Sequence, residues 1–291
     1  MAVLRLWRSS GKFRFGFTII FLLIAVALLH QPIIHWRLGK DAFGDYKDPM
    51  TAGLYPIFLS PSSAHWLGTD RYGRDVFALV MLALPTSLWV AFIAGAVSTV
   101  IGAVVGFTAG YRGGTTDSVL RTITDMFIVI PTLPLIIILS RYSDHVTSLQ
   151  LALILAIFSW PFAARVIRTQ VLSLRERPYI ELSKMTNMSD REIIVGDIFP
   201  NMAPYVAIGF ANASVGSALA LVGLTIIGMG PSNQMDLGRM IADALGWGAI
   251  SLHKEAIFIA PSVLLILLFV GLAWMGQGLE ETFNPRLRRP S

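Results

Sequence analysis

Residues able to do chemistry are scarce in this sequence, and two of them, Asp125 and Asn212, lie inside long apolar stretches. A polar or ionisable residue in such a stretch is a functional candidate by default. Arg121 stands four residues before Asp125, which favours a helical i,i+4 ion pair as the interpretation of that carboxylate. Asn212 could line a pathway or hydrogen-bond two helices together, and a single amide in an apolar stretch is more typical of the second role.

The sequence motifs of known catalytic sites are absent. There is no G-x-x-x-x-G-K-[ST] phosphate loop, no H-E-x-x-H zinc motif and no G-x-S-x-G nucleophile elbow. Cysteine is also absent, which excludes disulfides, thiolate nucleophiles and cysteine metal sites. The histidines are dispersed without metal-ligand spacing, at His30, His35, His65, His145 and His253. We therefore predict no catalytic residue, no metal site and no cofactor-binding residue in this chain.

The composition indicates that most of the helices that carry these polar residues lie in a membrane. Of 291 residues, 54% are hydrophobic and 14% are charged, and the mean hydropathy is +0.65. Soluble domains carry about 25% charged residues, so we predict a polytopic membrane protein. A span needs about 20 apolar residues. The uncharged windows are residues 15–36, 76–111, 126–140, 146–164, 198–235 and 256–279.

These windows predict an all-α fold with six transmembrane helices. The second and fifth windows are too long for one helix and too short for two, so each is interpreted as one helix plus an interfacial segment. The third window is short, and it spans the membrane only if its helix starts near Val119 and includes Asp125. The first window also resembles a cleavable signal peptide around residues 25–27, but the apolar run continues through Leu29 and favours a retained span.

The distribution of Lys and Arg near the span ends predicts the orientation. With the N-terminus inside, 15 of the 23 basic residues fall in inside segments, so both termini are predicted to be cytoplasmic. Those residues are Arg5, Arg8, Lys12, Arg14, Arg112, Arg121, Arg165, Arg168, Arg175, Arg177, Lys184, Arg191, Arg286, Arg288 and Arg289. The net charge of +5 therefore reflects topology, and no nucleic-acid partner is expected.

The longest polar connection, residues 35–83, is expected outside the membrane. Turn-forming residues at 65–76 precede an apolar run to Leu84, which predicts a loop leading into an amphipathic helix on the outer surface. We divide the chain into residues 1–84, the first span with this loop and interfacial helix, and residues 85–291, a five-helix core. A repeat of small residues typical of close helix packing is formed there by Gly102, Gly106 and Gly110.

The inside loop, residues 165–200, has the local signals of a helix-turn-helix. Pro178 fits the first turn of a helix, where its missing N–H costs nothing. Asn187 can end that helix in the left-handed conformation. Residues 189–192 have the Ser-x-x-Glu spacing of a capping box and predict a second helix, which ends at Pro200. A loop with six basic residues and a defined turn is either a docking site or an ordered, solvated connection.

Several segments resemble one family of membrane proteins. Residues 165–181 read RVIRTQVLSLRERPYIE and are similar to the cytoplasmic loop of permease subunits in ABC-type importers, and a degenerate form of that family's EAA motif follows. Residues 67–76 read LGTDRYGRDV and resemble the L-G-T-D-x-x-G-R-D-V signature of its dipeptide/oligopeptide/nickel branch, most closely the C-type permease subunit. Three further places resemble the same subunit: Asp125 followed by Pro131, residues 276–279 and residues 284–286.

The resemblance implies a division of labour between subunits. Two homologous permease subunits form the pathway, two separate cytoplasmic ATPase subunits bind ATP with Mg²⁺, and an extracytoplasmic substrate-binding protein delivers the substrate. A multi-pass position in the bacterial inner membrane and transport by alternating access are implied as well. The implied cargo is a di- or oligopeptide, with an oligosaccharide or a nickel chelate as alternatives. The alternatives from other classes are a membrane-embedded enzyme such as a protease, for which no nucleophile and base are apparent, and a membrane scaffold or receptor without transport activity.

Candidate site residues fall in three sets, the first two of which are carried over by resemblance. The ATPase-docking coupling loop holds Pro178, Tyr179, Glu181, Ser183, Thr186, Asn187, Ser189 and Asp190. The extracytoplasmic signature holds Gly68, Thr69, Asp70, Gly73, Arg74 and Asp75. The intramembrane polar residues are Asp125 and Asn212.

The sequence departs from the family in two places. The E-A-A-x-x-x-G pattern reads Glu-Leu-Ser-Lys-Met-Thr-Asn at residues 181–187, and asparagine is the next-best residue after glycine for a left-handed helix end. Residues 228–238 are shorter than the Pro-rich stretch of the family and lack its tryptophan. Because that stretch faces the binding protein, the substrate is the property that the resemblance predicts least well.

Overall fold

The computed structural model describes residues 10–41, 43–140, 146–231 and 234–283. In these residues the fold is helical and contains no strand, apart from two isolated β-bridges. The helices are α2 (Gly11–Leu28), α3 (His30–Leu38), α4 (Val76–Arg112), α5 (Gly114–Val129), α6 (Thr132–Ser140), α7 (Ser148–Leu174), α8 (Pro178–Met185), α9 (Asp190–Glu192), the π-helix η1 (Ile193–Ile198), α10 (Phe199–Ile226), α11 (Leu237–Gly246) and α12 (Ala256–Phe283). The predicted matches at residues 284–286, the terminal basic residues and His145 lie outside the described residues.

Five helical segments of the described chain are long and apolar enough to cross a membrane. They are Gly11–Leu28, Val76–Arg112, Ser148–Leu174, Asp190–Ile226 and Ala256–Thr282. The all-helical membrane fold is thus confirmed. The remaining predicted span is divided into α5 and α6. Ile130 has extended backbone angles between them, because the ring of Pro131 disfavours the α conformation in the preceding residue.

Helix α4 corrects the prediction of a short interfacial helix followed by a span. It runs unbroken for 37 residues through Pro85, and the predicted division between residues 84 and 85 therefore lies inside it. Its first turns are not on the surface, since Val76, Ala83 and Leu84 are fully buried. A proline is tolerated within such a helix because neighbouring helices and local adjustments compensate for the lost hydrogen bond.

The sequence predicted that the second helix of the 165–200 loop ends at Pro200, but in the structure the helix continues past this residue. Helices α9, η1 and α10 form one continuous helical run. In its π-helical part the N–H of Phe199 donates to the carbonyl of Ile194, five residues earlier. Pro200 follows directly at the start of α10. The missing N–H of Pro200 therefore falls where the hydrogen-bond register already changes, and the helix continues.

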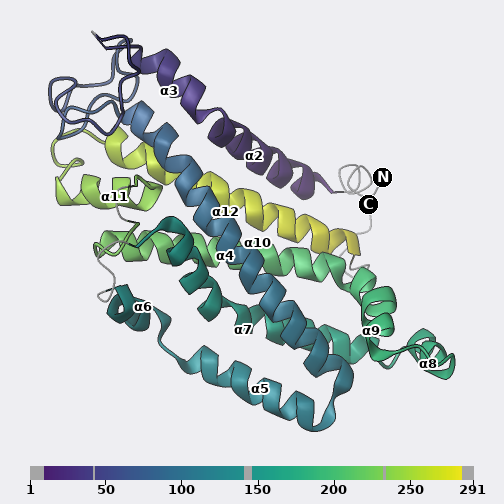
Figure 1. The fold of residues 1–291 in the computed structure, drawn as a ribbon. Helices are drawn as coiled ribbons and strands as arrows, with labels where there is room; N and C mark the ends of the chain where they lie inside the picture. Colours follow the sequence, from purple (N-terminus) through teal and green to yellow (C-terminus); the bar gives the residue numbers. More distant parts are fainter. Residues whose placement is uncertain (1–9, 42, 141–145, 232–233, 284–291) are drawn as a thin grey trace.

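Close packing of α4 on α7 forms the centre of the bundle (Figure 1). The glycine repeat predicted for this purpose lies in that contact. A Cβ atom added to Gly102 would lie 2.7 Å from the Cβ of Ala163, and one added to Gly106 would lie 2.8 Å from the carbonyl oxygen of Ala164. The prediction is confirmed, because a side chain at either position would collide with α7.

The first apolar window forms two helices, α2 and α3, joined at Leu29. Helix α2 packs along α12, where Gly16 and Gly271 allow close approach. At the far end of this pair, the Lys12 ammonium lies 2.6 Å from a carboxylate oxygen of Glu281. The start of α2 and the end of α12 therefore lie at the same end of the bundle.

Candidate functional site

The 165–200 loop and the polar segment before α4 lie at opposite ends of the helical bundle (Figure 1). In the loop, α8 begins at Pro178, as predicted. It ends at Met185, and two residues later Asn187 has a φ of 58°, which is the predicted left-handed conformation. The N–H of Asn187 donates to the carbonyl of Lys184, and the N–H of Met188 donates to that of Ser183. These bonds close the helix end and fix the turn.

The second arm of the loop begins with the predicted capping box. The N–H of Glu192 donates to Ser189 Oγ at 3.3 Å, and the N–H of Ser189 donates to Glu192 Oε2 at 2.7 Å. Ser183 Oγ donates to Asp197 Oδ2 at 2.6 Å and links α8 to η1. The two arms of the helix-turn-helix are therefore held together by their own polar side chains.

One side of α8 is fixed to the bundle and the other is free. Ile180 is fully buried in an apolar cluster built by α4, α7, η1 and α10. On the opposite side, the exposed fractions of Leu182 and Met185 are 63% and 75%, and Tyr179 is exposed beside them. Three apolar side chains that face away from their own bundle indicate a surface for another molecule.

The remaining residues of the predicted docking set lie in α8, in the turn after it and at the start of α9. Thr186 Oγ1 donates to the carbonyl of Ser183 at 2.9 Å, within the helix end. Asp190 lies 3.9 Å from the guanidinium of Arg112, at the end of α4. Glu181 is exposed in the first turn of α8, where a carboxylate is favoured by the helix dipole.

At the other end of the bundle, the signature residues build a closed turn before α4. Gly68 and Gly73 have positive φ values of 77° and 70°. A Cβ atom on either would collide with a backbone oxygen, that of Leu59 or that of Tyr55. Thr69 is buried and its hydroxyl donates to the carbonyl of Pro56 at 2.7 Å. The glycines and the threonine thus attach residues 51–60 to the turn.

The charged residues of the signature are buried and paired. Asp70 Oδ2 accepts from Arg74 Nε at 2.7 Å and lies 2.6 Å from Arg74 Nη2. Asp75 caps α4 by accepting from the N–H of Ala78 at 3.0 Å, and its other oxygen lies 2.7 Å from His65 Nδ1. The charged side chains of the signature are therefore engaged in internal contacts that hold the turn together.

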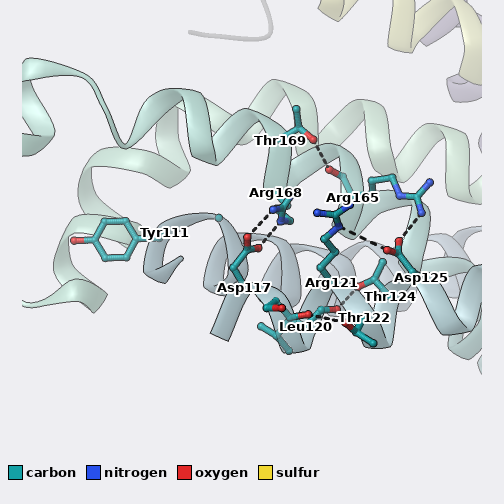
Figure 2. Close-up of polar contacts among 12 residues, drawn as sticks. Tyr111, Asp117, Leu120, Arg121, Thr122, Thr124, Asp125, Arg165, Arg168 and Thr169 are labelled. Carbon is teal, nitrogen blue, oxygen red and sulfur yellow. Dashed lines mark hydrogen bonds and ion pairs between the residues drawn. The ribbon is translucent and has the colours of Figure 1, made fainter. Parts of the chain in front are cut away.

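Asp125 takes part in contacts between helices that the sequence did not predict (Figure 2). The expected partner, Arg121, lies 3.7 Å away, but Arg165 Nη2 of α7 donates to Asp125 Oδ1 at 2.7 Å. Nearer the start of α5, Asp117 receives two hydrogen bonds from Arg168, one of them from Nη2 at 2.6 Å. Two ion pairs therefore join antiparallel helices. The charged residues can be read from the sequence, but the sequence does not reveal that α5 and α7 are neighbours.

Asn212 lies on α10 at the wall of a cavity of about 810 Å³. It is exposed there, and within the described residues it has no hydrogen bond. Within the described residues, Asn212 thus faces this cavity and makes no hydrogen bond to another helix. The cavity wall is mostly apolar, with polar groups from several helices: Thr132, Ser159, Gln170, Tyr205, Asn212 and Glu280.

A buried carboxylate that the sequence did not single out lies directly before α11, in the segment that follows α10. Asp236 is fully buried and caps α11 by accepting from the N–H of Arg239 at 3.1 Å. Its Oδ2 has no partner among the described residues. Burial raises the pKa of Asp236 to about 6, although the backbone N–H groups of Arg239 and Gly238 partly oppose the shift. Its N-cap position before a helix was the available sequence signal.

Known proteins match this chain over most of its length. Residues 102–289 match the family described as binding-protein-dependent transport system inner membrane component. The oligopeptide transport system permease protein OppC of Mycobacterium tuberculosis is 33% identical over 234 residues, which cover 80% of this chain and 79% of that protein. The dipeptide transport system permease protein DppC of Alkalihalophilus pseudofirmus is 32% identical over 78% of this chain and 74% of its own.

The glutathione transport system permease protein GsiD of Pectobacterium atrosepticum is 29% identical over 92% of this chain and 85% of its own length. The family match covers the end of α4 with its glycine contact to α7, the helices from α5 to α12 and the 165–200 loop. With its all-helical fold and five helices able to cross a membrane, the chain belongs to the family of binding-protein-dependent inner membrane transport components, as a permease subunit and not an enzyme.

Proposed function

We propose that this permease subunit conducts di- or oligopeptides by alternating access. It works with a second, homologous permease subunit and an extracytoplasmic substrate-binding protein. Two separate cytoplasmic ATPase subunits bind ATP and Mg²⁺ and drive the cycle. Peptide cargo is supported by the names of the relatives, which are permeases for oligopeptides, dipeptides and glutathione.

The proposed topology has six spans and two cytoplasmic termini. Support for the sixth crossing comes from the path of α5 and α6 along α7. Near the start of α5, Asp117 meets Arg168, and further along Thr132 shares a cavity wall with Phe158. Ile136 of α6 then lies in one apolar cluster with Leu151. The two short helices thus follow α7 backwards over most of its length. The contact of Lys12 with Glu281 supports termini on one side.

The observation that carries the proposal is the shape of α8 and its turn. A helix that begins at Pro178, is closed at its C-terminal end by the Asn187 turn and is buried at Ile180 would move as a unit with the bundle. Its outward side chains, Leu182 and Met185, would fit an apolar cleft on an ATPase subunit. Closure of the ATPase pair would then move α8, and the contacts of Ile180 would carry that displacement to α4, α7 and α10.

The proposed pathway wall is the cavity between α7 and α10. A peptide presents amide groups at every residue and side chains of many kinds. Amide and hydroxyl groups such as Gln170, Asn212 and Ser159 can exchange hydrogen bonds with any peptide backbone, while the apolar wall tolerates varied side chains. Weak, unspecific contacts suit a pathway that must release its cargo.

The experiment that tests the proposal replaces the outward face of α8. Leu182→Glu and Met185→Glu add charge at exposed positions, so the subunit should still fold and insert. We expect each variant to lower the amount of ATPase subunit that co-purifies by about tenfold, the effect of losing roughly 1.4 kcal/mol at the contact. The matched control is Leu252→Glu, which alters an exposed leucine between α11 and α12. The proposal would be contradicted if both variants co-purified with as much ATPase subunit as the unaltered chain, or if the chain formed a stable complex without any ATPase subunit.

A further inference from the structure

A cavity of about 430 Å³ lies between α4, α5 and α7, apart from the proposed peptide pathway. Its polar wall contains Arg121, Arg165, Arg168 and Asp125, with Thr124 beside them. Val105, Ala109 and Leu120 contribute apolar wall. A small cavity that combines three guanidinium groups with apolar surface is suited to an amphiphilic anion.

The charges around this cavity do not balance. Asp117 lies behind Arg168 and engages it with both carboxylate oxygens, and Asp125 accepts from Arg165. Arg121 remains, with its Nε at 3.7 Å from Asp125, beyond hydrogen-bond distance. Three cations thus face two carboxylates. Arg121 is 65% exposed in its side chain and has donors available, which Figure 2 places beside Arg165 and Asp125.

The depth of the cavity matches the headgroup layer of a membrane. Arg165 and Arg168 lie 17 and 20 residues after the start of α7. At 1.5 Å per residue this is about 26 and 30 Å along the helix, close to the hydrocarbon thickness of about 30 Å. If α7 enters the hydrocarbon near Ser148, its arginines emerge at the level of the lipid phosphates. Since phosphates lie at both surfaces, this holds in either orientation.

We propose that this cavity binds a phosphate group, with Arg121 as its main ligand and Arg165 and Arg168 as supporting donors. Guanidinium groups match phosphate oxygens in geometry and charge. The phosphate source is either the headgroup of an anionic phospholipid, whose acyl chains would follow the apolar wall, or free phosphate. The inference rests on the proposed membrane-spanning role of α7, but on neither the peptide cargo nor the ATPase contact.

The test uses the full-length chain in phosphatidylcholine vesicles that contain some photoactivatable phosphatidylglycerol. Cross-links should map to the peptides of Arg121 and Arg165, and Arg121→Gln should reduce them about fivefold, as expected for one basic residue near a membrane surface. Arg121 is exposed, so this variant should fold. Arg112→Gln is the matched control, because it removes the same charge from α4 outside the cavity.

Two further arms identify the ligand. Competition by inorganic phosphate at that site would assign free phosphate as the source, and its failure to compete would assign the lipid. Labelling that Arg121→Gln leaves unchanged would overturn the site. The vesicles hold no ATPase subunit, binding protein or peptide. A failure here therefore differs from a failure of the α8 experiment.

Discussion

The buried pair of Asp70 and Arg74 has a structural role that can be measured at the scale of one residue. Asp70→Asn would leave the guanidinium of Arg74 buried without its carboxylate. Breaking a buried pair from one side costs about 3–5 kcal/mol, so we expect a clearly lower midpoint of thermal unfolding for the purified subunit. Asp45→Asn, at an exposed position, is the control and should change little. Equal midpoints for both variants would contradict a structural role for the pair.

Asp236 predicts a dependence of stability on pH. Its pKa of about 6 in the folded chain lies above the ordinary 3.8, so the folded state binds the proton more tightly. Its contribution is therefore fully present below about pH 4 and is lost as the pH rises through about 6, at a cost of roughly 3 kcal/mol.

Asp236→Asn removes this titration and keeps a good N-cap for α11. We expect its unfolding midpoint at pH 7.5 to exceed that of the unaltered chain, with a weaker decline between pH 4 and 6. Asp236→Ala, which also removes the charge but loses the cap, is the matched comparison. An Asn variant with the original pH profile would show that this carboxylate does not titrate in that range.

The sequence predicted those residues whose role is decided by their own neighbours in the chain. Pro178, Asn187 and the Ser189 capping box act through backbone groups at most four residues away, and each has the predicted geometry. The pair of Arg165 with Asp125 spans 40 residues. Its formation depends on α5 and α7 being neighbours, which no local pattern encodes. The same holds for the buried pocket that raises the pKa of Asp236.

At the scale of elements, the contact of α4 with α7 depends on Gly106. A methyl group there would lie 2.8 Å from a backbone oxygen and 2.9 Å from the Cβ of Ile167. We expect Gly106→Ala to cost about 1–3 kcal/mol through overpacking, measured as a lower unfolding midpoint in detergent. Gly223→Ala in α10 meets nothing within 4 Å and should be neutral or slightly stabilising. Similar midpoints in both variants would mean that α7 can move away from α4.

Prolines explain why the helix boundaries were harder to predict than the helices. Pro85, Pro131 and Pro200 each lack an N–H, yet only Pro131 separates two helices. Pro85 lies in a part of α4 that is buried among neighbouring helices, and Pro200 follows a π-helical turn. Whether a proline ends a helix thus depends on tertiary contacts and hydrogen-bond register, neither of which the residue type reveals.

For the whole molecule, the number of crossings decides on which side each loop lies. Between the polar segment before α4 (residues 39–75, here called the proposed outer segment) and α8, the chain contains α4, the pair α5–α6, and α7. If α5 and α6 together cross the membrane, these make an odd number of crossings, and the proposed outer segment and α8 lie on opposite sides. If the pair does not cross, the number is even and both lie on the same side. One comparison of two positions therefore tests the sixth span.

The absence of cysteine makes this comparison direct, because an introduced cysteine is the sole thiol of the chain. Phe43 is 90% exposed in the proposed outer segment and Met185 is 75% exposed on α8. We expect a membrane-impermeant maleimide to label Phe43→Cys in cells with a permeable outer barrier and an intact inner membrane. Met185→Cys should react only after that membrane is opened. Labelling of both before opening would mean that α5 and α6 turn back within the bundle, and α8 could then not meet a cytoplasmic ATPase.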